Sequence, residues 1–170
     1  LDFSDFADSV NNELVANIGN FCYRVLSFLE KNFDSSFDSI EEDEKLFGEI
    51  IKLTEKIRED YDNVNFKNVV KGILELSSIG NKFFQDSEPW KLIKEDRERT
   101  NRILGSCVNI VKILGIVCSP ILPGFFDKLK KQIDIPELGW VDLNFELKKH
   151  KVNKAEILFD KMEIEKEEVF

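Results

Sequence analysis

ILGSCVNIVKILGIVC, residues 103–118, is the stretch that decides the fold. Its apolar residues recur at helical spacing but cover more than one face, which is typical of a central helix packed on several sides. Asn109 and Lys112 interrupt the run, so it contains no uncharged segment of about 18 residues that could cross a bilayer. The prolines of the following SPILPG, residues 119–124, end the helix, because proline lacks a backbone donor. We expect a buried core helix and no membrane span.

Further amphipathic segments flank this helix on both sides. Apolar residues three or four apart predict helices over roughly residues 5–32, 46–61 and 66–86, and a short helix over 125–132. Ser87 and Pro89 predict a fresh helix start that carries Trp90. Glycines inside the helices are expected to mark close packing: Gly48, Gly72, Gly80, Gly105 and Gly115. The predicted fold is all-α, a bundle of about five helices over residues 1–135 with an irregular C-terminal tail over 136–170.

Composition is consistent with one folded domain. The chain has 170 residues, of which 42% are hydrophobic, enough for a single sizeable core. Three isolated cysteines in apolar surroundings, Cys22, Cys107 and Cys118, suggest buried thiols and a cytoplasmic protein. The N-terminal sequence lacks the basic and apolar regions of a signal peptide.

The charge of the chain argues against a polyanionic partner. The formal net charge is -9, and its field repels phosphate. The acids cluster at residues 41–44 and 163–168, however, and a mixed, partly basic stretch lies between them at Lys91, Lys94, Arg97, Arg99 and Arg102. A basic surface of modest size is therefore possible, although such mixed charge is also typical of a solvated helix face.

Catalytic and metal sites are not predicted. The single histidine, His150, has no nucleophile or metal partner near it in sequence, and the cysteines lack CxxC spacing. No Gly-rich phosphate loop and no nucleophile elbow occurs. We expect no catalytic residue, no metal and no cofactor in this chain.

Two polar or aromatic features are candidates for recognition. Asn20 and Arg24 are four residues apart and so neighbour each other on one helix face, where an amide and a guanidinium could read base edges. The alternative is an ordinary polar pair on a wet surface. Trp90 could stack on an unpaired base, or it could be a buried core residue.

Four motifs in order resemble the anticodon-binding domain of methionyl-tRNA synthetases. VNNELVANIGNFCYR at 10–24 is similar to the family's opening helix, and GNKFFQDSEPWKL at 80–92 to its NKYFQ and PW signature. PILP at 120–123 and HKVNK at 150–154, followed by ILFDKME at 157–163, resemble its later segments. Phe83 departs from the usual Tyr, and Cys22 and Tyr23 stand where other residues are usual.

The resemblance implies a role for each candidate. Trp90 would stack on the first anticodon base, and Asn20 and Arg24 would hydrogen-bond to anticodon bases of CAU. The HIGH and KMSKS signatures are missing, so ATP-dependent methionine activation would belong to a catalytic domain expected before Leu1. The expected partners are the anticodon loop of methionine tRNA and that catalytic domain. Two alternatives stay open: the related domain of a cysteinyl, leucyl or isoleucyl enzyme, and a helical protein-interaction domain without an RNA ligand.

Overall fold

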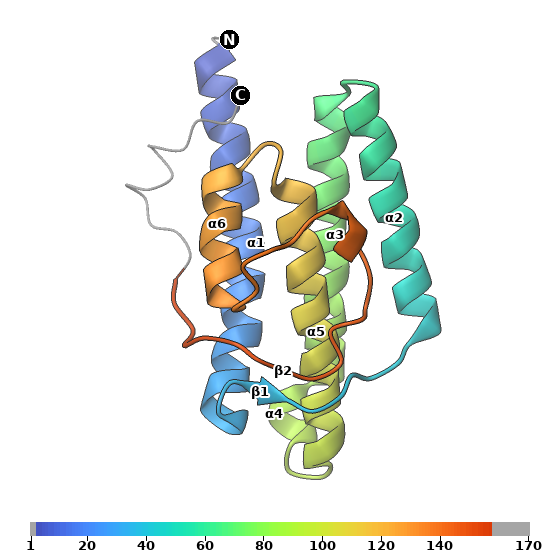
Figure 1. Cartoon of the computed structure of the whole chain (residues 1–170), viewed down its shortest axis with the longest axis vertical. Helices are drawn as coiled ribbons and strands as arrows, with labels where there is room; N and C mark the ends of the chain where they lie inside the picture. The colour runs from blue at the N-terminus through green and yellow to red at the C-terminus, as the bar shows by residue number, and fades with distance from the viewer. Residues whose placement is uncertain (1–2, 158–170) are drawn as a thin grey trace.

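Helices make up most of the computed structural model, which describes residues 3–157 (Figure 1). Five of the α-helices have ten residues or more, as predicted for an all-α bundle of about five helices. The elements in chain order are α1 (Phe3–Phe33), β1 (Ser36–Phe37), α2 (Glu44–Asp62), α3 (Phe66–Ser87), α4 (Pro89–Leu92), α5 (Arg97–Cys118), α6 (Pro123–Gln132), the 3-10 turn η1 (Trp140–Asp142) and β2 (His150–Lys151). Residues 158–170, which include the second acidic cluster and most of the ILFDKME motif, lie outside the described residues.

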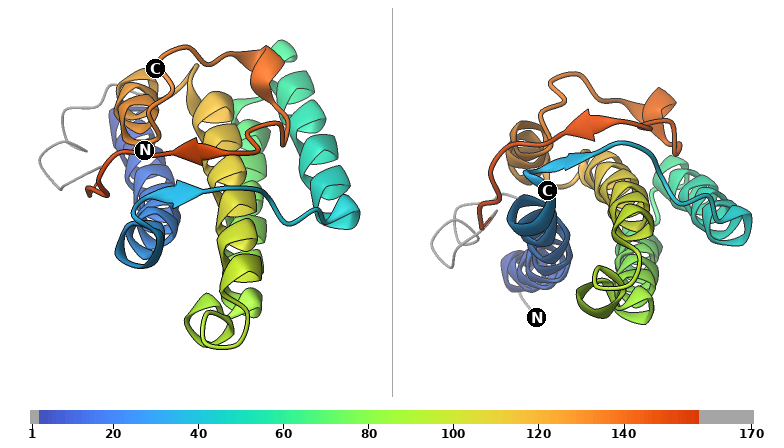
Figure 2. Two further views of the ribbon diagram at one scale, coloured as in Figure 1. Left: turned by 60° about the horizontal axis from the view of Figure 1, so that its bottom comes forward. Right: turned by 90° about the horizontal axis from the view of Figure 1, so that it is seen from below.

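Helix α5 occupies the centre of the bundle. Every residue from Ile103 to Cys118 is buried, because α1, α3 and α6 pack around it and α2 lies against α3 (Figure 2). By length and hydropathy alone α5 could cross a membrane, but 89% of its apolar window is buried inside the bundle. Its apolar surface is therefore core surface, as the sequence predicts.

Short polar side chains start three of the helices. Asp43, Asn65 and Asp96 are the N-caps of α2, α3 and α5, and each side chain accepts a hydrogen bond from the backbone N–H three residues later. Such caps satisfy donors that the first helical turn leaves free. The turns that connect the helices are thus specified locally.

Two glycines show where close packing is required and where it is not. A Cβ at Gly105 would lie 2.6 Å from the Ser39 carbonyl oxygen and 2.7 Å from Phe37, so α5 approaches the segment after β1 more closely than any side chain allows. A Cβ at Gly48 would meet nothing within 4 Å. The expectation that Gly48 marks close packing is therefore wrong, since this position faces solvent.

The strap, which we define as residues 136–157, crosses the bundle over α5 (Figure 2). Its strand β2 pairs antiparallel with β1, with Ser36 opposite Lys151. Its aromatic rings pack on α2: Phe145 stacks on Phe47 with ring centroids 3.7 Å apart, and Trp140 meets Tyr61 edge to face at 5.9 Å.

Buried polar groups on α5 also hold the strap. The Asn109 amide donates to the Leu147 carbonyl (2.9 Å) and accepts from the Leu147 N–H (3.2 Å). The Lys112 ammonium donates to Asn144 Oδ1 at 2.9 Å. Burial lowers the pKa of Lys112, while the carboxylates of Asp142 and Glu146 act in the opposite direction. The two residues that interrupt the apolar run are therefore the anchors of the strap.

The three cysteines are buried in the core as free thiols. Burial raises the pKa of each thiol well above its ordinary value, so the reactive thiolate is suppressed.

Replacing the two glycines with alanine should have opposite effects on stability. Gly105→Ala forces a Cβ against a backbone oxygen and should lower the free energy of unfolding by about 1–3 kcal/mol. Gly48→Ala adds a better helix former in open space and should raise it by about 0.5–1 kcal/mol. Urea titrations followed by circular dichroism would measure both. A Gly105→Ala protein as stable as the parent would contradict the close approach of α5.

Candidate nucleic-acid interface

Asn20 and Arg24 lie on the solvent side of α1, one turn apart. Both residues are exposed, whereas their neighbours Phe21 and Val25 are fully buried. The helical spacing therefore directs the apolar residues into the core and leaves the polar pair at the surface. Within the described residues no hydrogen bond holds the Asn20 side chain, so its amide can meet a ligand.

Arg24 is held by the neighbouring helix. Its Nη1 donates to Asn81 Oδ1 at 3.2 Å and its Nη2 to Gln85 Oε1 at 2.8 Å. The guanidinium carbon lies 4.9 Å from the centroid of the Phe84 ring, within the range of a cation–π contact. Three contacts from two adjacent turns of α3 therefore fix the orientation of an exposed arginine.

Trp90 reaches the surface through an unusual turn between α3 and α4. Glu88 has a left-handed backbone (φ 44°) and serves both as the C-cap of α3 and as the N-cap of α4. Pro89 follows at the first helical position, where its missing N–H costs nothing. Ser87 does not cap the new helix, because its hydroxyl donates back to the Phe83 carbonyl at 2.7 Å. The predicted fresh helix start that carries Trp90 is confirmed, and its N-cap is Glu88 rather than Ser87.

The Trp90 side chain is neither fully buried nor free. The residue is 38% exposed, and its ring centroid lies 6.2 Å from that of Phe84 at an interplanar angle of 52°. Phe84 itself is buried and meets Phe28 of α1 edge to face at 6.4 Å. Trp90 thus rests on the bundle with part of its surface open to solvent.

Phe84 links the candidate residues, since one ring contacts both the Arg24 guanidinium and the Trp90 indole. The structure therefore brings Arg24 and Trp90 together, although they are far apart in sequence. Asn20 shares the exposed face of α1 with Arg24, one turn towards the N-terminus. We call the surface formed by Asn20, Arg24 and Trp90 the recognition surface.

Sequence reasoning missed several residues that shape this surface. Asn81, Phe84 and Gln85 belong to the NKFFQ segment, which the sequence identifies only as part of a family motif. Asn81 and Gln85 are four residues apart on a helix, the spacing that could have identified them. Tyr23, which is 41% exposed, adds a second aromatic ring beside Asn20 and Arg24 on α1.

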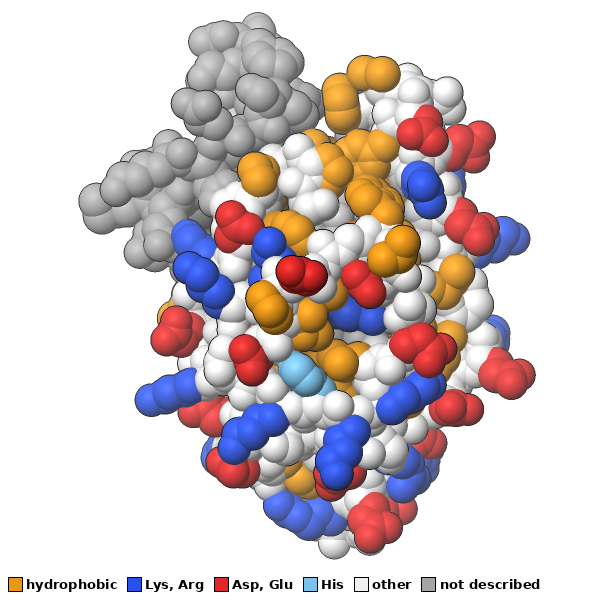
Figure 3. All heavy atoms as spheres, viewed as in Figure 1, with side chains coloured by type: hydrophobic (Ala, Val, Ile, Leu, Met, Phe, Trp, Pro, Cys, Tyr) orange, Lys and Arg blue, Asp and Glu red, His pale blue; other side chains and the backbone are white. Residues whose placement is uncertain are grey.

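The basic stretch near α4 is partly neutralised. Arg99 and Arg102 both pair with Glu41, with N–O distances of 3.6 and 3.1 Å. Lys91 pairs with Glu88 at 3.3 Å, while the guanidinium of Arg97 lies 4.5 Å from the Phe33 ring centroid. Figure 3 shows the side that carries the strap, where acidic and basic side chains are interspersed and no large region has one sign. In the basic stretch itself, four of the five cations are paired with a carboxylate or lie against an aromatic ring, so an RNA contact there would depend on specific groups rather than on unpaired positive charge.

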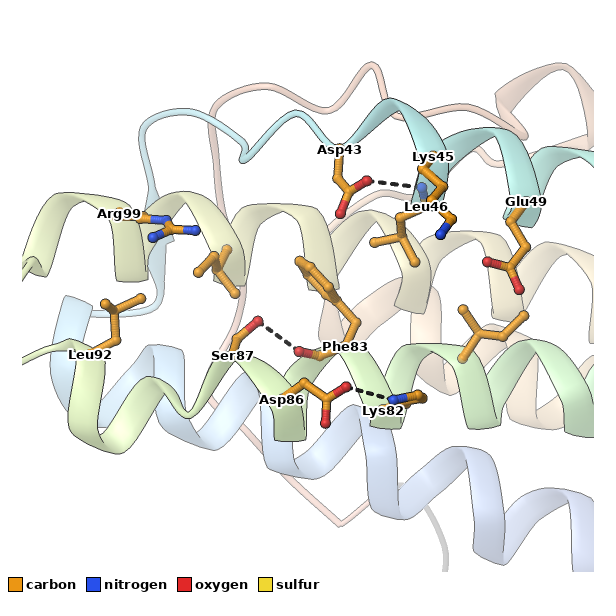
Figure 4. A pocket seen from close by; sticks show the side chains of 12 residues that line it. Asp43, Lys45, Leu46, Glu49, Lys82, Phe83, Asp86, Ser87, Leu92 and Arg99 are labelled. Atoms are coloured by element: carbon orange, nitrogen blue, oxygen red, sulfur yellow. Dashed lines mark hydrogen bonds and ion pairs between the residues drawn. The ribbon is translucent and has the colours of Figure 1, made fainter.

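A pocket of about 600 Å³ opens between α2, α3, α4 and the start of α5 (Figure 4). Its floor is apolar and includes Phe83 and Leu92, whereas its rim carries charges of both signs. At that rim Lys82 pairs with Asp86 at 2.7 Å, and the Asp43 carboxylate is used as a helix cap. The pocket presents no convergent set of polar groups, so it is not the candidate site.

The one histidine and the metal-ligating side chains of the described residues form no catalytic or metal-binding arrangement. His150 Nε2 is within 2.7 Å of the Ile133 carbonyl oxygen, a contact that serves the strap. No group of three or more His, Cys, Asp or Glu side chains converges on a possible metal position in residues 3–157. The recognition surface offers stacking and hydrogen bonding, which are the interactions that read unpaired bases.

Comparison with known proteins identifies the family of the chain. The family model described as the anticodon binding domain of methionyl tRNA ligase matches residues 35–170. The methionine–tRNA ligases of Methanopyrus kandleri and Pyrococcus horikoshii are 38% and 37% identical to the chain over 161 and 164 residues. Each match covers 94% of this chain but only 23% of the relative, so the chain spans about a quarter of the length of these relatives.

Solved structures show the same fold. The free-state Mycobacterium tuberculosis methionyl-tRNA synthetase superposes with a TM-score of 0.81 at 20% identity, over 95% of this chain and 35% of that one. The form of that enzyme bound by methionyl-adenylate gives a TM-score of 0.78 at 19% identity, over 94% and 34%. Because the family model matches most of this chain, the chain belongs to the family of methionyl-tRNA ligase anticodon-binding domains.

Proposed function

We propose that this chain recognises the CAU anticodon of methionine tRNA through the recognition surface. One base would stack on Trp90, and Asn20 and Arg24 would hydrogen-bond to base edges. The observation that carries the proposal is the contact of Phe84 with both the Arg24 guanidinium and the Trp90 ring, which groups a stacking platform and a fixed donor on one exposed surface. Membership in the methionyl family disfavours the cysteinyl, leucyl and isoleucyl alternatives and the protein-interaction domain without RNA.

The acidity of the chain is compatible with this role. Unpaired bases are read by stacking and by hydrogen bonds, which need few phosphate contacts from the module that reads them. Most phosphate contacts would then fall to the catalytic part of the enzyme. The proposed complex is thus specific at a few residues and weak in its general attraction for RNA.

We also propose that the chain works beside a catalytic domain that supplies the ATP-dependent charging of the tRNA in the cytoplasm. The relatives that match are about four times longer than this chain. The strap offers a docking surface for such a domain, since Val141 is 89% exposed and lies beside the half-buried Trp140. Hydrophobic side chains gather in the upper half of the face seen in Figure 3.

The chain alone should not activate methionine. Because its sequence has no phosphate-cradling loop and no adenylate-forming signature, methionine-dependent exchange of pyrophosphate into ATP should stay at the level of a blank without protein. A full-length methionyl-tRNA synthetase assayed in parallel would give the positive signal. Exchange above the blank by the purified chain would contradict the assignment of chemistry to another domain.

Trp90→Ala should weaken binding of a CAU anticodon stem-loop. Loss of one base stack is worth about 1–3 kcal/mol, so the Kd should rise roughly 5- to 150-fold. Fluorescence anisotropy with a labelled stem-loop would measure the Kd, and thermal unfolding of the same sample would give the Tm.

Trp140→Ala is the matched control, since η1 lies on the strap side near the middle of the bundle, whereas α4 lies at one end of it (Figure 1). Trp140 packs on Tyr61, so its removal should lower the Tm more than Trp90→Ala while leaving the Kd unchanged. A Trp90→Ala protein that binds the stem-loop as tightly as the parent would exclude the stacking role, and a larger Tm loss than that of Trp140→Ala would identify Trp90 as a core residue.

A further inference from the structure

We infer that Asn81 and Gln85 are positioning residues that hold the Arg24 guanidinium in the orientation needed to read a base. The inference rests on the proposed function of the recognition surface. Both side chains accept hydrogen bonds from Arg24, at 3.2 and 2.8 Å, and they accept from different Nη atoms. Two separate acceptors on one planar group define its orientation as well as its position.

The Asn81 acceptor is itself held in place by a further hydrogen bond. The Asn81 amide also donates to the Ser77 carbonyl at 3.3 Å, and the Ser77 hydroxyl donates to Asn17 Oδ1 on α1 at 2.6 Å. A ladder of polar contacts therefore links α1 and α3 and leads to Arg24. Beneath this ladder, the Phe21 ring packs against α3 at Gly80. A Cβ added at Gly80 would lie 2.8 Å from the Phe21 ring. The distance between the two helices is thus set by packing, so the backbone that carries both acceptors is fixed relative to α1.

The third constraint on Arg24 is the Phe84 ring. The guanidinium carbon lies 4.9 Å from the centroid of this ring, and the Trp90 ring lies 6.2 Å from it on the next element. Arg24 and Trp90 are therefore both positioned relative to the same buried side chain. A base that stacks on Trp90 would meet the guanidinium at a fixed distance and angle.

Asn81, Gln85 and the Phe84 ring, which we call the clamp, leave part of the Arg24 guanidinium available to a ligand. Two N–H groups are used by Asn81 and Gln85, and the remaining N–H groups of this five-donor side chain can bond to a ligand. An arginine held in this way recognises the geometry of acceptors on a base edge. Without the clamp, the same arginine would act as a mobile charge, which attracts RNA but discriminates little.

Discrimination between anticodons should therefore fall when Gln85 is truncated. The measured quantity is the ratio of Kd values for a UAU and a CAU stem-loop. Gln85→Ala should lower this ratio roughly three- to tenfold, about the effect of one hydrogen bond. Gln85→Glu retains an acceptor for Arg24, so it should preserve the ratio even where added negative charge weakens binding of both RNAs. Ser78→Ala, an exposed neutral change on the same helix, is the control and should alter neither value.

A double-mutant cycle tests whether Gln85 acts through Arg24. Arg24→Ala alone should reduce the ratio, and adding Gln85→Ala to it should cause no further loss. If Gln85→Ala reduces the ratio equally with and without Arg24, the residue contacts RNA by itself and the positioning role is wrong.

A measurement without RNA separates this inference from the proposed function. ¹⁵N relaxation of the Arg24 Nε–H group should report a rigid side chain in the parent and in Gln85→Glu, and a mobile one in Gln85→Ala and Asn81→Ala. If Arg24→Ala and Gln85→Ala both leave RNA binding unchanged, the proposed recognition surface is wrong, and the relaxation data still decide whether the clamp exists. Equal mobility of Arg24 in all four proteins would overturn the clamp.

Discussion

Burial of α5 on every side is the constraint on which the other elements depend. A helix whose residues 103–118 are all buried must be covered by α1, α3, α6 and the strap, so none of these can be displaced without exposing apolar surface. The close approach at Gly105 removes the remaining freedom between α5 and the segment after β1. The proposed recognition surface lies on the outer sides of α1 and α3 and on the short α4, which the core holds in place but does not cover.

The recognition surface combines a rigid base with a few exposed groups. Phe84 is buried, yet it contacts both an exposed arginine and a partly exposed tryptophan. The energetic cost of ordering these side chains is met during folding, so a ligand would not have to bear it. Such preorganisation would compensate for the repulsive field of a chain with net charge -9, in which Arg99 and Arg102 are already paired with Glu41.

Sequence periodicity was sufficient to predict the long helices, because their apolar spacing and their capping residues are local properties of the sequence. The central position of α5 and the surface position of Arg24 follow from the same spacing. The shared contact of Arg24 and Trp90 with Phe84 does not follow from this spacing. It depends on the relative position of α1 and α3 and on the left-handed turn at Glu88. Glu88 gave no signal, since glutamate is not a residue type that favours this conformation. Gly48 shows the opposite error: a glycine in a helix suggested a contact that the fold does not make.

The anchoring of the strap has a consequence for how the chain folds as it is synthesised. Asn109 and Lys112 lie within α5, but their partners Leu147 and Asn144 are made more than 30 residues later. Until those residues leave the ribosome, the Lys112 ammonium lacks its acceptor and the Asn109 amide keeps only its bond to the Gly105 carbonyl within α5, so both must stay in contact with water. The side of α5 that carries Asn109 and Lys112 therefore cannot be covered before the strap has been synthesised.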